Sequence, residues 1–76
     1  MKVKIYTTPN CYFCKMAKQY FESKNIPYEE VDVSVNVDAA KEMIEKTGQM
    51  GVPVIEVENN IIIGFNRNAL ERIFQK

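Results

Sequence analysis

The 76-residue sequence contains no histidine and no tryptophan, and it has only two cysteines, three glycines and three prolines. Because a structural zinc ion needs about four ligands, usually cysteine or histidine, one chain alone cannot complete such a site. The scarcity of glycine and proline, together with 46% hydrophobic and 26% charged residues, argues against a disordered or low-complexity chain. The sequence therefore predicts a single ordered domain over residues 1–76.

An excess of positive charge is also lacking, because ten basic residues balance ten acidic ones. Nucleic-acid-binding domains and membrane-surface segments usually carry a basic patch, so neither partner is predicted. The longest apolar run, residues 61–65, is far too short to span a bilayer. The opening residues, MKVKIYTT, lack the hydrophobic region and cleavage site of a secretory signal. We therefore expect a cytoplasmic protein.

The first half of the chain shows the pattern of a strand, a helix, a strand and a helix. Residues 2–7 alternate, with Val3, Ile5 and Thr7 on one side. From Cys11 the apolar residues recur at helical spacing, and this helix must end before Pro27.

A second strand is predicted over residues 28–35, and a second helix over residues 36–48. Asn36 is the expected N-cap of this helix, and Gly48 lies just past its end. Its core-facing side chains are predicted to be Val37, Ala40 and Ile44.

The second half predicts a hairpin and a final helix. Residues 53–57 and 61–65 read as strands, joined by a tight turn at Asn59-Asn60. The last segment, residues 66–76, places Leu70, Ile73 and Phe74 at helical spacing. The order β-α-β-α-β-β-α predicts an α/β fold with a four-stranded mixed sheet and three helices. The first two strands should be parallel and the last two antiparallel.

Both cysteines lie in one short stretch, Cys11-Tyr12-Phe13-Cys14, where the first predicted helix begins. A disulfide between them would close too short a loop to stabilise the fold appreciably, and a reducing cytosol does not maintain static disulfides. Two inert buried cysteines, or a dimer sharing two cysteine pairs around a metal, are alternatives. The preceding strand and following helix favour a thiol–disulfide redox centre.

A helix N-terminus suits such chemistry, since unpaired N–H groups and the helix dipole stabilise a thiolate. Cys11 lies at the N-cap position and should be the more exposed thiol, whereas Cys14 lies one turn inside and should be shielded. Thiol–disulfide exchange requires an attacking thiolate and a second thiol that resolves the mixed disulfide. The pattern therefore predicts Cys11 as the nucleophile and Cys14 as the resolving thiol. Lys15 and Lys18 add positive charge nearby.

Over its whole length the chain resembles a glutaredoxin. Family members open with a strand ending in Tyr-Thr, followed by a Cys-Pro-Tyr-Cys type motif, which here is Cys11 to Cys14. The family's Thr-Val-Pro loop matches Gly51-Val52-Pro53, and its Gly-Gly-x-Asp segment matches residues 63–66. The resemblance implies a thioredoxin-like fold, a cis bond before Pro53 and a glutathione groove. The groove residues that it implies are Thr8, Tyr12, Phe13, Gln49, Gly51, Val52, Pro53, Gly64, Phe65 and Asn66.

The chain departs from the family pattern at several of these positions. Thr8 stands where many members have a lysine, and Gln49 where an arginine often precedes the proline loop. Tyr12 replaces the motif proline, and Asn66 replaces the acidic residue. Glutathione, an acidic tripeptide, would thus lose two cationic contacts. The changes bring the sequence closer to short glutaredoxin-like redoxins, some of which take electrons from thioredoxin reductase and reduce ribonucleotide reductase.

The resemblance implies an oxidoreductase that reduces glutathione mixed disulfides and protein disulfides, with glutathione as electron donor and no tightly bound cofactor or resident metal. Its partners would be glutathione and disulfide-containing or glutathionylated proteins, and we expect a monomer. Thioredoxin reductase as donor is one alternative function. A dimer that binds zinc or an iron–sulfur cluster through two cysteine pairs is another.

Overall fold

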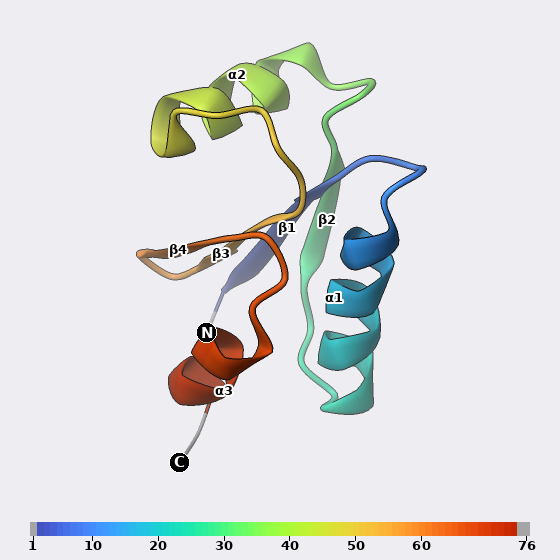
Figure 1. Cartoon of the computed structure of the whole chain (residues 1–76), viewed down its shortest axis with the longest axis vertical. Coiled ribbons are helices and arrows are strands. Elements are labelled where there is room, and N and C mark those ends of the chain that lie inside the picture. Colours follow the sequence, from blue (N-terminus) through green and yellow to red (C-terminus); the bar gives the residue numbers. More distant parts are fainter. Residues whose placement is uncertain (1, 75–76) are drawn as a thin grey trace.

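A four-stranded sheet forms the centre of the computed structural model, which describes residues 2–74 (Figure 1). The strands β1 (Val3–Thr7), β2 (Glu29–Asp32), β3 (Val54–Val57) and β4 (Asn60–Ile63) lie in the order β2-β1-β3-β4. β1 runs parallel to β2 and antiparallel to β3, and β3 is antiparallel to β4. The predicted element order and mixed sheet are confirmed.

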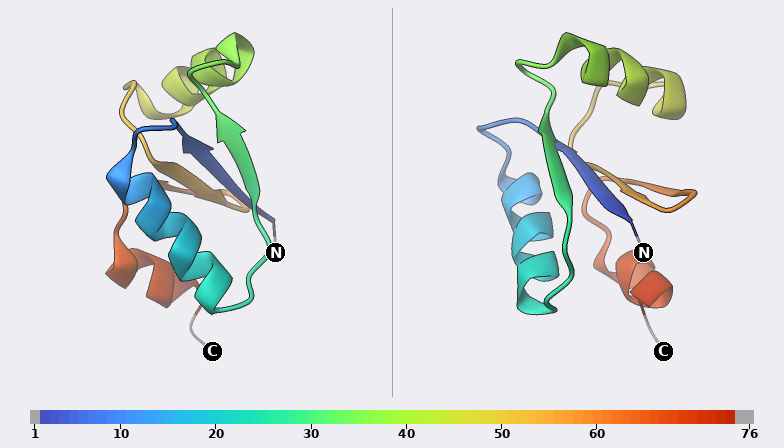
Figure 2. Two further views of the ribbon diagram at one scale, coloured as in Figure 1. Left: turned by 90° about the vertical axis from the view of Figure 1, so that its right-hand side faces the viewer. Right: turned by 180° about the vertical axis from the view of Figure 1, so that it is seen from behind.

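The three helices cover both faces of this sheet (Figures 1 and 2). Helices α1 (Tyr12–Ser23) and α3 (Arg67–Phe74) pack on the face that carries Ile5, in one apolar cluster. Helix α2 (Val37–Thr47) packs on the opposite face, where Tyr6 is buried. The alternation in β1 therefore separates two apolar cores rather than core from solvent. β1 therefore lies at the centre of the fold, and its last residue, Thr7, is buried.

The prediction for the buried side of α2 is wrong by one helical row. Val37 is 65% exposed, and Ala40 is only half-buried, whereas Ala39 and Met43 are buried. Ala39 and Met43 pack in the cluster that contains Tyr6. Two neighbouring rows of α2 carry apolar residues. The row with Ala39 and Met43 faces the sheet, although the sequence pattern favoured the row with Ala40 and Ile44. The predicted caps are confirmed, since Asn36 Oδ1 accepts a hydrogen bond from Ala39 N and Gly48 is left-handed with φ 75°.

The hairpin turn also differs from the prediction. Val57 pairs with Asn60, so the two turn residues are Glu58 and Asn59, and Glu58 takes a positive φ of 54°. The register explains the shift, because Ile62 must point into the core, and a slip of one residue would turn it outward.

The second strand is shorter than predicted and ends at Asp32. The Asp32 carboxylate accepts a hydrogen bond from Ser34 N (2.9 Å), an arrangement that turns the chain away from the sheet.

Candidate active site

Three loops meet at one end of the sheet. Tyr6 of β1 lies opposite Val54 of β3, so the chain leaving β1 toward Cys11 runs beside the chain entering β3. Gly64 N donates to Pro53 O (2.8 Å), which joins the segment after β4 to the same place. The left panel of Figure 2 shows the start of α1, the loop before β3 and the turn before α3 along one edge. The strand pairing thus brings together segments far apart in the sequence.

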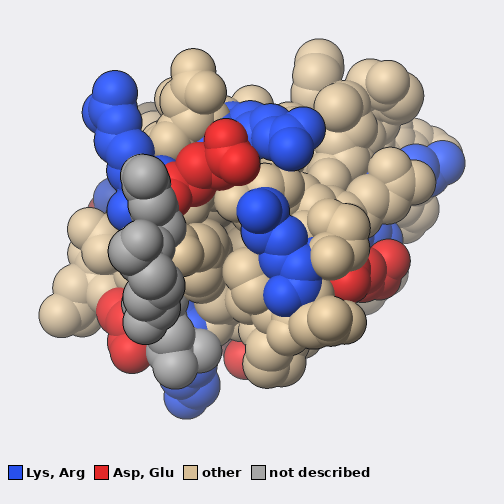
Figure 3. Space-filling view, turned by 90° about the horizontal axis from the view of Figure 1, so that it is seen from below, with Lys and Arg blue, Asp and Glu red and all other residues tan. Residues whose placement is uncertain are grey.

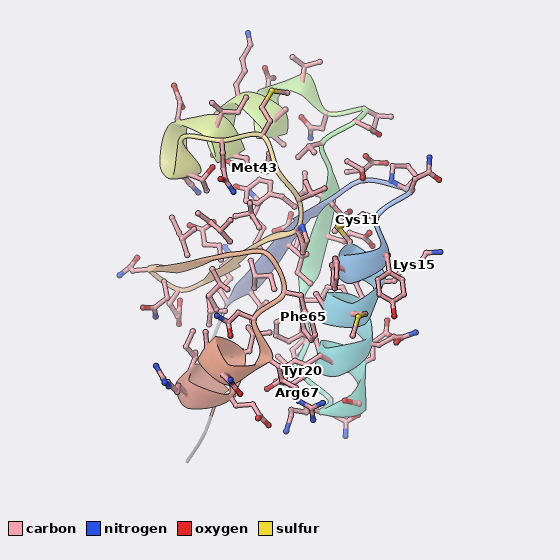
Figure 4. The ribbon with its side chains drawn as sticks, viewed as in Figure 1. Cys11, Lys15, Tyr20, Met43, Phe65 and Arg67 are labelled. Carbon is pink, nitrogen blue, oxygen red and sulfur yellow. A yellow bond between two sulfur atoms is a disulfide. The ribbon has the colours of Figure 1, made fainter. Side chains whose placement is uncertain are left out.

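The two cysteines form a disulfide at the start of α1, with 5.2 Å between their Cα atoms (Figure 4). Cys11 has extended backbone angles (φ −106°, ψ 112°), and its Sγ accepts a hydrogen bond from Cys14 N (3.1 Å). This is the N-cap geometry that the sequence predicts, with sulfur in place of the usual oxygen. The same N–H would face a thiolate on Cys11 after reduction, and would therefore stabilise it.

The two sulfurs differ in accessibility. Cys14 is 1% exposed, whereas Cys11 is half-buried and reaches solvent. The predicted difference in exposure is confirmed. A bulky disulfide can approach only the accessible sulfur, so this geometry suits attack by Cys11 and resolution by Cys14, and these roles stay predictions.

The nearby lysines are directed away from the disulfide. Lys18 Nζ lies 2.9 Å from Glu30 Oε2, and Thr7 Oγ1 donates to the same oxygen at 2.9 Å. The hydrogen bond from Lys18, aided by that from Thr7, lowers the pKa of Glu30 even though burial opposes the shift. Lys15 is exposed and projects from the outer side of α1 (Figure 4). The backbone N–H of Cys14 at the start of the helix, rather than these two lysine side chains, contacts the Cys11 sulfur.

Glu30 and Thr7 were missed by the sequence reasoning. Thr7 is buried and Glu30 lies on the neighbouring strand, so their hydrogen bond ties β1 to β2 beside the second turn of α1. No local sequence signal marks the pair, because it depends on the register of parallel strands.

The aromatic residues between the cysteines are on the surface. Tyr12 is 68% exposed and Phe13 is 56% exposed, and their rings meet edge to face with centroids 5.3 Å apart. The resemblance implies that Phe13 lines a groove, although four residues later the same side of the helix carries the buried Ala17. The exposure excludes the core position and makes both rings available to a ligand beside Cys11.

The proline loop carries the cis bond that the resemblance implies, between Val52 and Pro53. Val52 is half-buried and Pro53 is buried, whereas Gly51 is exposed. Thr8 follows β1 directly and is half-buried. Gln49 precedes this loop: its side-chain amide lies beside Gly51, and its backbone N–H donates to Thr47 Oγ1 (3.2 Å) at the end of α2.

The segment after β4 contributes backbone more than side chains. Gly64 has φ 80°, a left-handed conformation that favours glycine, and Asn66 Oδ1 caps α3 by accepting from Ala69 N (3.1 Å). Phe65 packs against Tyr20, with ring centroids 6.2 Å apart, and so faces the core between α1 and α3. Arg67 lies over the Tyr20 ring, 5.8 Å from its centroid (Figure 4).

Among residues 2–74, no group of three or more cysteine, histidine, aspartate or glutamate side chains is placed to bind a metal ion. Within the same described range, no helix is both long and apolar enough to cross a membrane.

Comparison with known proteins decides the family. The family model for glutaredoxin matches residues 3–62. The chain belongs to the glutaredoxin family. A glutaredoxin-like 8.6 kDa protein encoded in a rubredoxin operon of Clostridium pasteurianum is 42% identical over 74 residues, covering 97% of this chain and 99% of the relative. Together with the disulfide, this makes the chain a glutaredoxin-family thiol–disulfide oxidoreductase.

Relatives of two kinds are similar to this glutaredoxin-family chain. Glutaredoxin 3 of Escherichia coli is 34% identical over 62 residues, covering 82% of this chain and 75% of the relative. The glutaredoxin-like protein NrdH of Lactococcus lactis is 31% identical over 74 residues, covering 93% of this chain and 97% of the relative. Among solved structures, the E. coli NrdH-redoxin superposes with a TM-score of 0.83 at 25% identity, over 100% of this chain and 99% of that one. The thioredoxin-like fold is therefore confirmed.

Proposed function

We propose that this protein, acting as a monomer in the cytoplasm, reduces protein disulfides and glutathione mixed disulfides through its Cys11–Cys14 dithiol. The observation that carries the proposal is the unequal burial of a cysteine pair at a helix start. An accessible sulfur that accepts a backbone N–H is suited to attack. A shielded sulfur one turn away is suited to resolve the product.

The proposed reaction proceeds in two exchanges. The Cys11 thiolate attacks one sulfur of the client disulfide, which forms a mixed disulfide and releases the first client thiolate. Cys14 then loses its proton and attacks Cys11 Sγ, which forms the Cys11–Cys14 disulfide and releases the second client thiolate. Two electrons pass from the dithiol to the client, and the client thiolates take up protons from solvent. The structure, with its Cys11–Cys14 disulfide, corresponds to the oxidised form of the protein that these two exchanges would produce.

Glutathione is the first candidate for the electron donor that restores the dithiol. The similarity to glutaredoxin 3 supports it. In this proposal the backbone of Val52 pairs with the tripeptide, the exposed ring of Phe13 packs on it, and backbone N–H groups at the start of α3 donate hydrogen bonds to one of its carboxylates. The uncharged Thr8 and Gln49 imply modest affinity, because each replaces a cationic contact.

Thioredoxin reductase is the second candidate donor, and a specific observation favours it. Lys18 is paired with Glu30, and Lys15 projects outward, so neither cation near the disulfide is directed toward an anionic tripeptide. The chain also matches NrdH proteins over nearly their whole length, and the E. coli NrdH-redoxin is described by a thioredoxin-like activity profile.

A paired coupled assay tests the function and the donor together. Oxidised protein is offered NADPH with glutathione and glutathione reductase in one reaction, and NADPH with thioredoxin reductase in the other, each with a protein disulfide as final acceptor. We expect NADPH oxidation that depends on this protein in at least one of them, and the faster reaction identifies the donor. Absence of disulfide reduction in both reactions, and with the chemically reduced protein, would refute the proposed function.

A further inference from the structure

The sheet has two outer edges, and they differ in charge. One edge is β2, which carries Glu29, Glu30 and Asp32. The other edge is β4, whose residues Asn60–Ile63 include no charged side chain and no proline. An edge strand presents unpaired backbone groups, and proteins usually prevent its pairing with other chains by charged side chains or proline. Charge thus protects the β2 edge of this sheet, whereas the β4 edge lacks both kinds of protection.

The open edge of β4 presents the backbone of two isoleucines. Gly64 N donates to Pro53 O (2.8 Å), so the polar groups of Gly64 point toward β3. Because this direction alternates along an antiparallel strand, Ile62 also points toward β3, whereas Ile61 and Ile63 point their N–H and C=O groups outward. Within the described part of the chain, no strand lies beyond β4. These outward groups are therefore available to a strand from another chain.

The same two isoleucines expose their side chains on one face of the sheet. Ile61 is 41% exposed and Ile63 is 52% exposed, and both lie on the face that carries α2, whereas Ile62 points into the core on the opposite face. Elsewhere the surface carries charges of both signs, as on the face seen from below, where α3 lies (Figure 3). β4 thus combines outward backbone groups with exposed β-branched side chains, which favour pairing in a sheet.

We propose that two copies of this chain pair through the outer edges of β4, antiparallel and about a two-fold axis, so that their sheets join. In such a pair each copy contributes the same residues. The outward groups define the register: when Ile61 of one copy lies opposite Ile63 of the other, every outward N–H and C=O of these residues gains a partner. Ile62 then lies at the two-fold axis, and the exposed isoleucines of both copies form one apolar cluster on the α2 face.

The charges beyond the two ends of β4 are complementary in this register. Glu58, in the turn before β4, is exposed and forms no ion pair with another residue in the range 2–74. The side chain of Arg67, at the start of α3, is 67% exposed, and its ion pair with Glu71 is long (4.0 Å). Antiparallel pairing directs Glu58 of each copy toward the start of α3 of the other, where Arg67 lies. By contrast, two β2 edges would bring acidic side chains together, and these would repel one another.

Pairing through β4 leaves the proposed function to single chains. Each copy keeps its own disulfide at the start of α1, and the contact is limited to two short strands and their ends. Small interfaces of this kind are weak, so the chains pair when concentrated and separate when dilute. The pairing is therefore independent of the proposed reduction of disulfides.

Sedimentation equilibrium of the oxidised protein, in which Cys11 and Cys14 are closed in a disulfide, measures this association without interference from free thiols. We expect the average mass to rise from that of one chain toward that of two as the concentration approaches the order of 1 mM. A single-chain mass at every concentration up to this value would overturn the proposal.

Hydrogen exchange followed by NMR locates the contact. The amides of Ile61 and Ile63, which point outward, should exchange at least about twofold more slowly at the highest concentration than in dilute solution. The amide of Ile62, which points toward β3, should exchange at the same rate in both. Association that slows none of these amides, or slows all three equally, would contradict pairing through the β4 edge.

Charge variants test the register. Ile61→Lys should weaken pairing by at least about tenfold, because an ammonium group in each copy would lose water without gaining a partner. Ile61→Lys/Ile63→Glu should recover much of the pairing, because the introduced ammonium of one copy then lies opposite the introduced carboxylate of the other. Val35→Lys is the matched control, since Val35 is 78% exposed in the turn after β2, and this variant should pair as the wild type does. Urea unfolding checks that each variant is folded.

The outcomes for the variants are separate from the proposed function. Pairing that Ile61→Lys leaves unchanged, or that Val35→Lys also abolishes, would overturn the β4 interface. A double variant that pairs no better than Ile61→Lys would overturn the register. Rates of disulfide reduction measured on dilute protein should be the same for the wild type and Ile61→Lys, because dilute chains act singly in either case.

Discussion

The two ends of the central sheet differ in charge and chemistry. At one end lie the Cys11–Cys14 disulfide and the uncharged segments that follow β1, β2 and β4 and precede β3. At the other end a hollow of about 260 Å³ is lined only by charged side chains, and these are Lys2, Lys4, Glu29, Glu56 and Glu58. Both ends use the same strands, and the charged lining includes paired strand residues, namely Lys4, Glu29 and Glu56.

The two ends also differ in what their side chains contribute to stability. Ion pairs near the charged end, such as Lys4–Glu42 (3.2 Å) and Lys46–Glu56 (3.1 Å), are partly exposed, and such pairs stabilise a fold little. The disulfide end exposes apolar side chains that a merely stable domain would bury. Substitutions at the disulfide end should therefore change activity with little effect on stability, and substitutions at the charged end should do neither strongly.

The largest effect is expected for Cys11→Ser. Without the accessible sulfur no mixed disulfide forms, so reduction of protein disulfides and of glutathione mixed disulfides should both fall to background. Steady-state rates with one substrate of each kind measure this, and urea unfolding of the reduced wild type and variant provides the control for folding. Residual activity in a folded variant would show that another group attacks.

The next largest effect is expected for Cys14→Ser. A client protein trapped on Cys11 needs Cys14 for release, whereas glutathione can itself resolve a small mixed disulfide. Protein-disulfide reduction should therefore fall more than about tenfold, and reduction of a glutathione mixed disulfide much less. Equal loss of both activities would contradict the division of roles between the two sulfurs.

A smaller effect is expected when charge is introduced at the uncharged end. Thr8→Lys should lower the apparent KM for a glutathione mixed disulfide by up to about tenfold, because a hydrogen bond to a charged group contributes about 1.5–3 kcal/mol when shielded and less when exposed. The gain should shrink as salt rises. An unchanged KM at low salt would mean that Thr8 does not face the bound tripeptide.

The smallest effect is expected toward the charged end, for Glu42→Gln. Hydrogen bonds from Tyr6 (2.9 Å) and Lys4 lower the pKa of Glu42, so the carboxylate favours the folded state above its unfolded pKa of about 4.3. That contribution is lost as pH falls through the lower, folded pKa. The variant should lose less stability than wild type between about pH 6 and about pH 3, measured by urea unfolding, and should keep its activity. If the variant and the wild type lose the same stability over this pH range, the Glu42 carboxylate does not contribute to the loss of stability in acid.

Much of the fold could be predicted from local signals in the sequence. The change from strand to helical spacing at Cys11, the cap at Asn36 and the glycine at Gly48 each act within one turn, and each is confirmed. The cysteine pair was identifiable because motif, strand and helix coincide. The cis bond before Pro53 followed from the resemblance and not from local rules.

What could not be predicted depends on tertiary contacts. Apolar residues occupy two adjacent rows of α2, and only packing on Tyr6 selects Met43 over Ile44. Phe13 shares a helical row with buried residues, yet it is 56% exposed, because burial depends on where the helix overlaps the sheet. Lys18 pairs with Glu30 only because β2 lies beside β1.

Alkylation of the reduced protein across pH tests the central claim most directly, namely that the uncharged end presents Cys11 as an activated thiol. Limiting reagent is added at each pH, and the modified cysteine is identified by mass spectrometry. We predict that Cys11 is modified first, with a midpoint below the free-thiol pKa of about 8.5, and that the shielded Cys14 reacts more slowly at every pH. Faster modification of Cys14, or a Cys11 midpoint at or above that of a free thiol, would contradict the account.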